Sequence, residues 1–346
     1  IFFLLFTSLW SFYISIKPPK IISDITPKNL GLEYEEVSFT TSDGIKLIGW
    51  WLPNKNSAAK TLILLHGYPA DKGDILPALS FLAEKYNLLL FDFRYLGQSG
   101  GSYSTAGAKE TADLAAAIQY LKTRGINEVG VWGFSMGGAV ALMTAPRTPE
   151  IKAIVSESSY VRLDSMANEL YRIPLLKYPL AKLTLFWTKL FLGINVYEAS
   201  PIESVKNLNI PILLIHSIND EVIPFRHAEL LAEALKNNSK VEFWFEENLV
   251  HGQFGEEYQK RIENFFDKNF GSANTMKIRN RKMEDVVMEF IWIKKNLNYL
   301  RLNFMAHNKH FCFQNTSGVT QSVVVLLSAC LIIISFVSGY FLALSA

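Results

Sequence analysis

The chain has 346 residues, 49% of them hydrophobic, and its formal net charge is +2 at pH 7. This length and apolar content allow one large domain with a sizeable core and room for additional segments. The small net charge provides no overall basic field, so nucleic acid is not expected as a partner. The two cysteines, Cys312 and Cys330, lie near the C-terminus in neither a metal-ligand nor a redox spacing.

Residues 1–16, IFFLLFTSLWSFYISI, carry no charge and are followed by the sequence KPPK. Such a segment predicts a hydrophobic membrane anchor or a signal segment. Because the first residue is Ile1, we expect this segment to be truncated at its start.

Short apolar runs alternate with longer amphipathic ones over residues 30–270. EEVSFTTSDG and KLIGWWLP predict an opening antiparallel pair that turns at Ser42-Asp43-Gly44. Six later runs lack polar alternation, which is typical of strands covered on both faces: TLILLHG, NLLLFDFR, EVGVWGFS, IKAIVSES, IPILLIHS and KVEFWFEE. These runs are separated by segments in which apolar residues recur with helical spacing: 74–86, 108–125, 135–145, 225–237 and 256–270. The pattern predicts an α/β fold with a mostly parallel, doubly wound sheet.

Two regions depart from this alternation. Residues 161–205 are too long for a simple crossover and are rich in large apolar side chains, so they predict a helical cap over one edge of the sheet. Residues 271–318 form a basic linker with an amphipathic region, which either lies on a membrane or packs as an ordinary helix.

The C-terminal segment, residues 319–346, lies in a stretch without any charged residue. It is long enough to cross a bilayer of about 30 Å and predicts a transmembrane helix. The expected location is therefore a membrane. The side stays open, because the basic residues before this helix favour the cytoplasm whereas a signal anchor would place the domain outside.

Gly133-Phe134-Ser135-Met136-Gly137 follows a predicted strand and opens a predicted helix. A G-x-S-x-G turn in this context projects the serine from the end of the sheet, and its flanking glycines let the backbone pass close to its neighbours. The helix N-terminus offers free N–H groups to a developing negative charge. Ser135 is therefore the candidate nucleophile, and Gly133 and Gly137 are the glycines of the nucleophile elbow.

A serine nucleophile needs a base and an acid that orients the base. His251 is the candidate base, because it lies on a loop between the last predicted strand and the last predicted helix. The other five histidines lie in the tail, on a helix, at a strand end or ahead of the nucleophile: His307, His310, His227, His216 and His66. Asp220 follows a strand and is the candidate acid; Glu221 and Glu157 are its competitors.

Backbone N–H groups are the expected oxyanion donors. One is that of Met136, directly after the nucleophile, and the second is assigned to Tyr68 in the loop HGYPADKGD. Gly67 has no side chain and leaves room for a substrate. No metal cluster, phosphate loop or dinucleotide fingerprint competes with this constellation, so no metal and no cofactor are expected.

Five motifs in order, LLHGYP, FDFRYLGQSGGSYST, GFSMGG, HSINDEVIP and LVHGQF, make residues 30–270 resemble the α/β-hydrolase superfamily. The opening LEYEEVSFTTSDGIKLIGWWLP is similar to its membrane-anchored Bem46/ABHD13-like branch. The resemblance implies Ser135, Asp220 and His251 as a catalytic triad. It also implies a structural turn at FRYLGQSGG, which leaves its four conspicuous residues out of catalysis: Arg94, Gly97, Ser99 and Gly101.

The predicted function is a serine hydrolase that cleaves an ester, thioester or amide of a small acyl substrate through an acyl-enzyme. The apolar cap beside a membrane favours an apolar or lipid-like substrate. A peptidase or an acyltransferase on the same fold is the alternative chemistry. A membrane-tethered binding scaffold with an idle triad is the non-enzymatic alternative.

Overall fold

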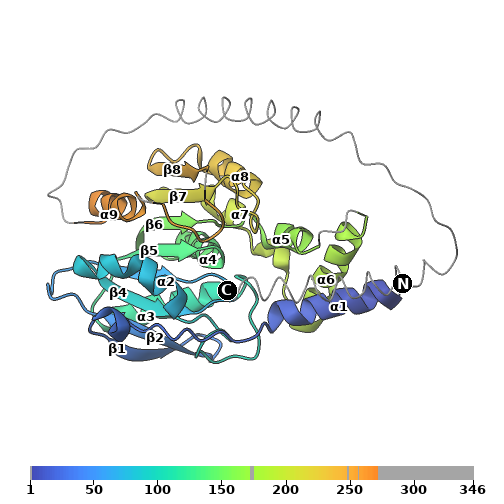
Figure 1. The fold of residues 1–346 in the computed structure, drawn as a ribbon, viewed down its shortest axis with the longest axis horizontal. Coiled ribbons are helices and arrows are strands. Elements are labelled where there is room, and N and C mark those ends of the chain that lie inside the picture. The colour runs from blue at the N-terminus through green and yellow to red at the C-terminus, as the bar shows by residue number, and fades with distance from the viewer. Residues whose placement is uncertain (1, 172–174, 248, 256, 272–346) are drawn as a thin grey trace, which may run out of the picture. The chain divides into compact units, whose positions relative to one another are not determined.

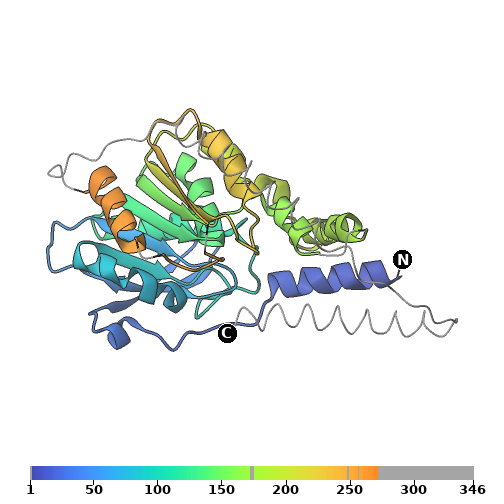
Figure 2. The same cartoon turned by 45° about the horizontal axis from the view of Figure 1, so that its top comes forward.

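The computed structural model describes residues 2–171, 175–247, 249–255 and 257–271. The predicted transmembrane helix at 319–346 lies outside these residues, as does the predicted basic region at 271–318 apart from Gly271. Within the described part, a sheet flanked by helices forms the main body. Two helices, α1 (Phe2–Ile16) and α6 (Lys177–Leu192), extend beside each other away from it (Figures 1 and 2).

The sheet has eight strands in the order β1-β2-β4-β3-β5-β6-β7-β8. Their bounds are β1 Glu35–Thr40, β2 Lys46–Leu52, β3 Thr61–Leu65, β4 Asn87–Phe91, β5 Val129–Phe134, β6 Ile151–Glu157, β7 Ile212–Ser217 and β8 Val241–Glu246. β2 pairs antiparallel with both β1 and β4, and every pair from β4 onward is parallel. The predicted opening hairpin and the mostly parallel sheet are both confirmed.

Helices cover both faces of the sheet and bury a core on each. One core contains side chains of α3 Glu110–Thr123, α4 Met136–Thr144 and α8 Arg226–Leu235, and the other contains those of α2 Lys72–Leu79 and α9 Tyr258–Asn269. Along β3, Leu62 and Leu64 enter the second core, whereas Ile63 and Leu65 enter the first. Because both faces are covered, the strand needs no polar alternation.

The helix predicted at 74–86 differs from the observed one. Asp71 caps α2 by accepting hydrogen bonds from the N–H groups of Gly73 and Asp74, so the helix begins at Lys72. It ends at Leu79 and continues as a 3₁₀ turn over Ser80–Glu84. The other four predicted helices lie within two residues of α3, α4, α8 and α9 at either end.

The 161–205 insertion is helical, as its composition predicts. It contains α5 Leu163–Glu169, α6 Lys177–Leu192 and α7 Pro201–Val205. The N-terminal apolar segment forms α1 Phe2–Ile16, which packs on α6. Among the described residues, no helix is both long enough and apolar enough to cross a membrane.

Candidate active site

Ser135 occupies a sharp turn between β5 and α4. Its backbone has φ 52° and ψ −113°, a conformation that non-glycine residues rarely adopt. A Cβ atom at Gly133 would lie 2.4 Å from the backbone of Gly137, and one at Gly137 would lie 2.5 Å from the carbonyl oxygen of Leu65. Only glycine fits at these two positions, so the motif glycines are explained by close backbone approach.

The candidate acid and base are in contact. His251 Nδ1 lies 2.7 Å from Asp220 Oδ2, and Asp220 Oδ1 accepts hydrogen bonds from the N–H groups of Val222 and Ile223. Burial favours the neutral acid, but the hydrogen bonds from His251 and the Ile223 N–H outweigh it and hold the pKa of Asp220 below its ordinary value. An ionised Asp220 holds the proton on His251 Nδ1 and leaves Nε2 as the basic nitrogen.

The His251 ring lies beside the nucleophile elbow. Its centroid is 4.7 Å from that of Phe134, the residue directly before Ser135. In the described part of the chain, no hydrogen bond joins Ser135 to His251. Catalytic hydrogen bonds are often long without substrate and shorten when substrate binds, so this geometry is compatible with a base that acts on Ser135.

The loop after β3 lies against the same elbow. A Cβ atom at Gly67 would be 3.4 Å from the Cβ of Ser135, which places the neighbouring Tyr68 next to the serine. Among the described residues, neither the N–H of Tyr68 nor that of Met136 has a hydrogen-bond acceptor. Two free donors therefore lie close to Ser135, as an oxyanion site requires.

His66 supports this loop from inside the protein. Its Nε2 accepts a hydrogen bond from the N–H of Phe93, so Nδ1 carries the proton that it donates to the carbonyl oxygen of Gly67, 2.6 Å away. Burial lowers the pKa of His66 and keeps the ring neutral. Both ring nitrogens of His66 therefore form hydrogen bonds with backbone groups.

A buried ion pair between Lys72 and Asp92 joins the Tyr68 loop to the turn after β4. Their side chains lie 2.7 Å apart, and Asp92 also accepts from the N–H groups of Lys72 and Gln98. Lys72 is only 1% exposed and lies over the ring of Trp50. Sequence reasoning missed this pair; the signal was a lysine inside the motif loop and an aspartate at the end of an apolar strand.

Glu157, one competitor for the acid role, has another partner. Tyr258 donates its hydroxyl hydrogen to Glu157 Oε2 at 2.5 Å and accepts from Trp132 Nε1 at 3.0 Å. Burial raises the pKa of Glu157 to about 8. A carboxyl group that is protonated at neutral pH is a poor partner for an imidazolium, which favours Asp220.

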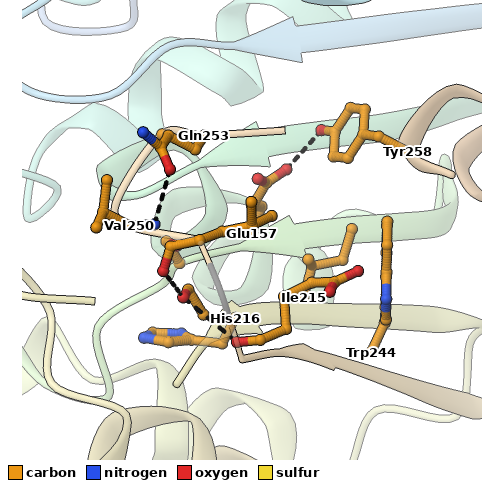
Figure 3. A pocket seen from close by; sticks show the side chains of 12 residues that line it. Glu157, Ile215, His216, Trp244, Val250, Gln253 and Tyr258 are labelled. Atoms are coloured by element: carbon orange, nitrogen blue, oxygen red, sulfur yellow. Dashed lines mark hydrogen bonds between the residues drawn. The ribbon is translucent and has the colours of Figure 1, made fainter. Parts of the chain in front are cut away.

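Glu157 and Tyr258 line a small recess beside the loop that carries His251 (Figure 3). Its walls come from the ends of β6, β7 and β8 and from residues 249–258, and they include neither Ser135, nor His251, nor any residue of α5, α6 or α7. The side chain of Gln253 accepts from the N–H of Val250 across this loop. The recess is therefore lined by strand ends and by the loop that carries His251, and it is separate from the nucleophile and from the helical insertion.

The remaining described histidines and the predicted turn have structural contacts. His227 accepts from the N–H of Val161 and His216 lies beside the carbonyl oxygen of Ile223, and burial lowers the pKa of both rings. Arg94 is buried and binds Asp113 and Asp43. His307 and His310 lie outside the described residues.

The other three residues of the predicted turn also have local roles. Gly97 and Gly101 have positive φ, and Ser99 donates its hydroxyl to the carbonyl oxygen of Asp92. No catalytic role is needed to explain the turn.

Comparison with known proteins gives the family. The model of the prolyl oligopeptidase family matches residues 99–273. The chain is 31% identical over 218 residues to protein YfhR of Escherichia coli, covering 60% of this chain and 70% of that protein. It is 27% identical over 254 residues to protein bem46 of Schizosaccharomyces pombe, covering 70% and 80%. It is 26% identical over 226 residues to the membrane protein YNL320W of Saccharomyces cerevisiae, covering 64% and 74%.

Solved structures agree with the fold. The esterase Pf2001 of Pyrococcus furiosus superposes with a TM-score of 0.61 at 32% identity, over 73% of this chain and 100% of that one. The acylaminoacyl peptidase of Pyrococcus horikoshii has a TM-score of 0.56 at 19% identity, over 74% and 44%, and shares the fold. The chain is therefore a hydrolase of the prolyl oligopeptidase family, a member of the α/β-hydrolase superfamily in its Bem46-like branch.

Proposed function

We propose that this chain is a serine hydrolase that cleaves a carboxylic ester or a related acyl bond through an acyl-enzyme. The observation that carries the proposal is the Asp220–His251 pair beside the Ser135 elbow, with two free N–H donors on the adjoining backbone. These are the nucleophile, base, orienting acid and oxyanion donors that acyl transfer needs.

The proposed reaction has two halves. Ser135 Oγ attacks the acyl carbon while His251 Nε2 takes the hydroxyl proton, and the Tyr68 and Met136 N–H groups bind the oxyanion. The bond to the leaving group breaks as His251 returns the proton to it, which leaves Ser135 acylated. Water then attacks the acyl-enzyme, again with His251 as base, and releases the acid.

An ester is favoured over a peptide as substrate. The esterase Pf2001 is matched over its whole length at 32% identity, whereas the peptidase match shows the fold alone. The apolar insertion of α5 and α6 favours an apolar or lipid-like acyl group. Membrane location is part of the proposal, supported by the uncharged segments at both ends and by the relative YNL320W, described as a membrane protein.

The test is labelling of the full-length protein with a fluorophosphonate probe. Wild type is expected to be labelled, Ser135→Ala is expected not to be, and Ser102→Ala, which changes an exposed serine, serves as the matched control. p-Nitrophenyl esters of graded chain length then measure the acyl preference, and peptide anilides measure the alternative peptidase activity. If folded wild-type protein is not labelled, the proposed hydrolase activity is refuted and the binding scaffold with an idle triad is favoured.

A further inference from the structure

The chain segment at the end of α1 lies against the loops around the candidate active site. Residues 15–25 begin in the last turn of α1 and end before the 3₁₀ turn at Pro27–Leu30, and from α1 the chain runs back along the main body toward β1 (Figures 1 and 2). We name residues 15–25 the strap. Pro18 and Pro19 stiffen it, because the proline ring fixes φ.

The strap is bonded to both ends of the loop that follows β3. At one end, the Tyr68 hydroxyl donates to the carbonyl oxygen of Ser15 at 3.0 Å. At the other end, Asp71 Oδ2 accepts from the N–H of Ser23 at 2.8 Å, while Asp71 Oδ1 accepts from the N–H groups that open α2. Asp71 is only 2% exposed. The loop over residues 68–71 is thus held at two points by one continuous piece of chain.

The strap also packs closely on the start of α2. A Cβ atom at Gly73 would lie 2.7 Å from the Cβ of Ser23 and 2.8 Å from the carbonyl oxygen of Ile25. Because glycine has no side chain, the strap can approach the helix closely enough for the Ser23 N–H to reach Asp71. The glycine of the loop motif is therefore explained by this contact.

Other contacts fix the strap itself. The Tyr95 hydroxyl, on the turn after β4, donates to the carbonyl oxygen of Pro18 at 3.1 Å. The N–H of Ser104 donates to the carbonyl oxygen of the last residue of α1 at 2.9 Å. Farther along α1, Trp187 of α6 donates its indole N–H to Ser8 Oγ at 3.0 Å. A segment can position a loop only when it is held elsewhere, and these bonds to a second loop and to α6 provide that support.

The backbone of Tyr68 needs such support. Among the described residues, neither its N–H nor its carbonyl oxygen has a hydrogen-bond partner, so the hydroxyl bond to Ser15 holds this residue. A donor that serves an oxyanion stays unpaired until substrate binds, and its position has to be fixed through other atoms. A Cβ atom at the neighbouring Gly67 would be 3.4 Å from the Cβ of Ser135, so a shift of this loop moves the donor relative to the nucleophile.

We propose that the strap positions the oxyanion donor: the Tyr68 hydroxyl and the Asp71 carboxylate, both bonded to the strap, hold the Tyr68 N–H where the oxyanion forms. This role rests on the proposed function and deepens it, because it makes the segment after the apolar N-terminal helix part of the active-site support. The Tyr68 side chain and Asp71 are positioning groups that act through the backbone N–H.

Tyr68→Phe tests the bond from the loop. It is expected to lower kcat for a p-nitrophenyl ester about 10- to 100-fold with KM nearly unchanged, because a donor displaced by about 1 Å loses the oxyanion more than the ground-state carbonyl. The affinity for a trifluoromethyl ketone, which forms an oxyanion on Ser135, should fall in parallel. Tyr95→Phe is the matched control, since it removes a hydroxyl that donates to the same strap from the turn after β4, and it should leave kcat unchanged.

Ser23→Pro tests the strap from its own side, at a position outside the active site. Proline removes the N–H that Asp71 accepts, so kcat and the affinity for the ketone are expected to fall with KM nearly unchanged. Ser23→Ala is the control, because it keeps this N–H and removes only the hydroxyl oxygen that accepts from the N–H of Ile25. If Tyr68→Phe and Ser23→Pro match their controls in kcat and in ketone affinity, the positioning role is overturned.

A third measurement does not depend on activity. Hydrogen–deuterium exchange of the full-length protein in detergent, in a Ser135→Ala background, follows the N–H of Lys72, which donates to Asp92 at the end of the loop. Exchange is expected to be about tenfold faster in Tyr68→Phe and Ser23→Pro than in their controls, because the loss of one hydrogen bond loosens the loop. Equal exchange would overturn the positioning role, whether or not the enzyme is active. Wild-type protein that hydrolyses no ester and is not labelled would instead refute the proposed function, and the exchange rates would still decide whether the strap holds the loop.

Discussion

His251 Nδ1 lies 2.7 Å from Oδ2 of Asp220, although 31 residues separate the two along the chain. Asp220 also accepts hydrogen bonds from two backbone N–H groups, and these hold its carboxylate in place independently of the imidazole. The pair links β7, which ends at Ser217, to the loop that follows β8. Because the carboxyl ends of parallel strands lie at one edge of the sheet, this link brings His251, the candidate base, to the edge where β5 ends next to Ser135.

Asp220→Asn is expected to lower kcat/KM for a p-nitrophenyl ester by about 10⁴-fold, because an amide at this position can hold the wrong imidazole tautomer. Fluorophosphonate labelling should slow in parallel. Glu221→Gln is the matched control, since it neutralises the next carboxylate in the chain. A larger loss of kcat/KM in Glu221→Gln than in Asp220→Asn would show that the orienting acid is not Asp220.

Glu157→Gln is expected to stabilise the fold at alkaline pH. The folded-state pKa of Glu157 is raised to about 8 by burial, against an ordinary value of 4.5. As the pH rises between these values the unfolded chain loses the proton while the folded chain keeps it, so stability falls with pH. Glutamine removes this titration and still accepts from Tyr258.

Chemical denaturation in one detergent, repeated across this pH range, measures the effect. The variant and wild type should converge near pH 4.5, and the variant should be more stable by a few kcal/mol near pH 8. If the difference in unfolding free energy between the variant and wild type does not change with pH, Glu157 does not carry the proton.

Gly137→Ala is expected to cost about 3 kcal/mol or more in folding free energy and to abolish the proposed esterase activity, because its Cβ would lie 2.5 Å from the carbonyl oxygen of Leu65. Gly255→Ala is the control, since its Cβ would make only ordinary contacts of 3.6 Å or more. Thermal unfolding and ester hydrolysis measure the two effects. An active, stable Gly137→Ala protein would contradict the observed elbow.

Lys72→Met is expected to destabilise the fold by about 3–5 kcal/mol, because it leaves Asp92 buried without its charged partner. Asp92→Asn in the same chain should recover part of this loss, since the unpaired charge is then gone. A double-mutant cycle on unfolding free energies measures the coupling. Strictly additive losses would mean that the two side chains do not act as a pair. Activity should fall in Lys72→Met as well, because the pair joins the Tyr68 loop to the turn after β4.

Much of this protein can be read from its sequence because the relevant signals are local. Uninterrupted apolar runs predict covered strands, and the G-x-S-x-G spacing predicts the elbow, since both depend on neighbours within a few residues. The positions of Asp220 and His251 after strands predict them as the candidate acid and base, because topology sets the edge at which parallel strands end.

Tertiary structure alone decided which polar groups meet and in which state. Glu157 contacts Tyr258 across 101 residues of chain, and its protonation follows from burial that no local pattern encodes. Helix α2 begins at Lys72, two residues before its predicted start, because Asp71 caps the helix. The same lysine pairs with Asp92. In α1 the sequence predicted an uncharged segment, but only the contacts of Ser8 with Trp187, 179 residues away, show which face is turned inward. Pairing and pKa depend on groups brought together by folding, whereas helix and strand patterns depend on groups already close in the chain.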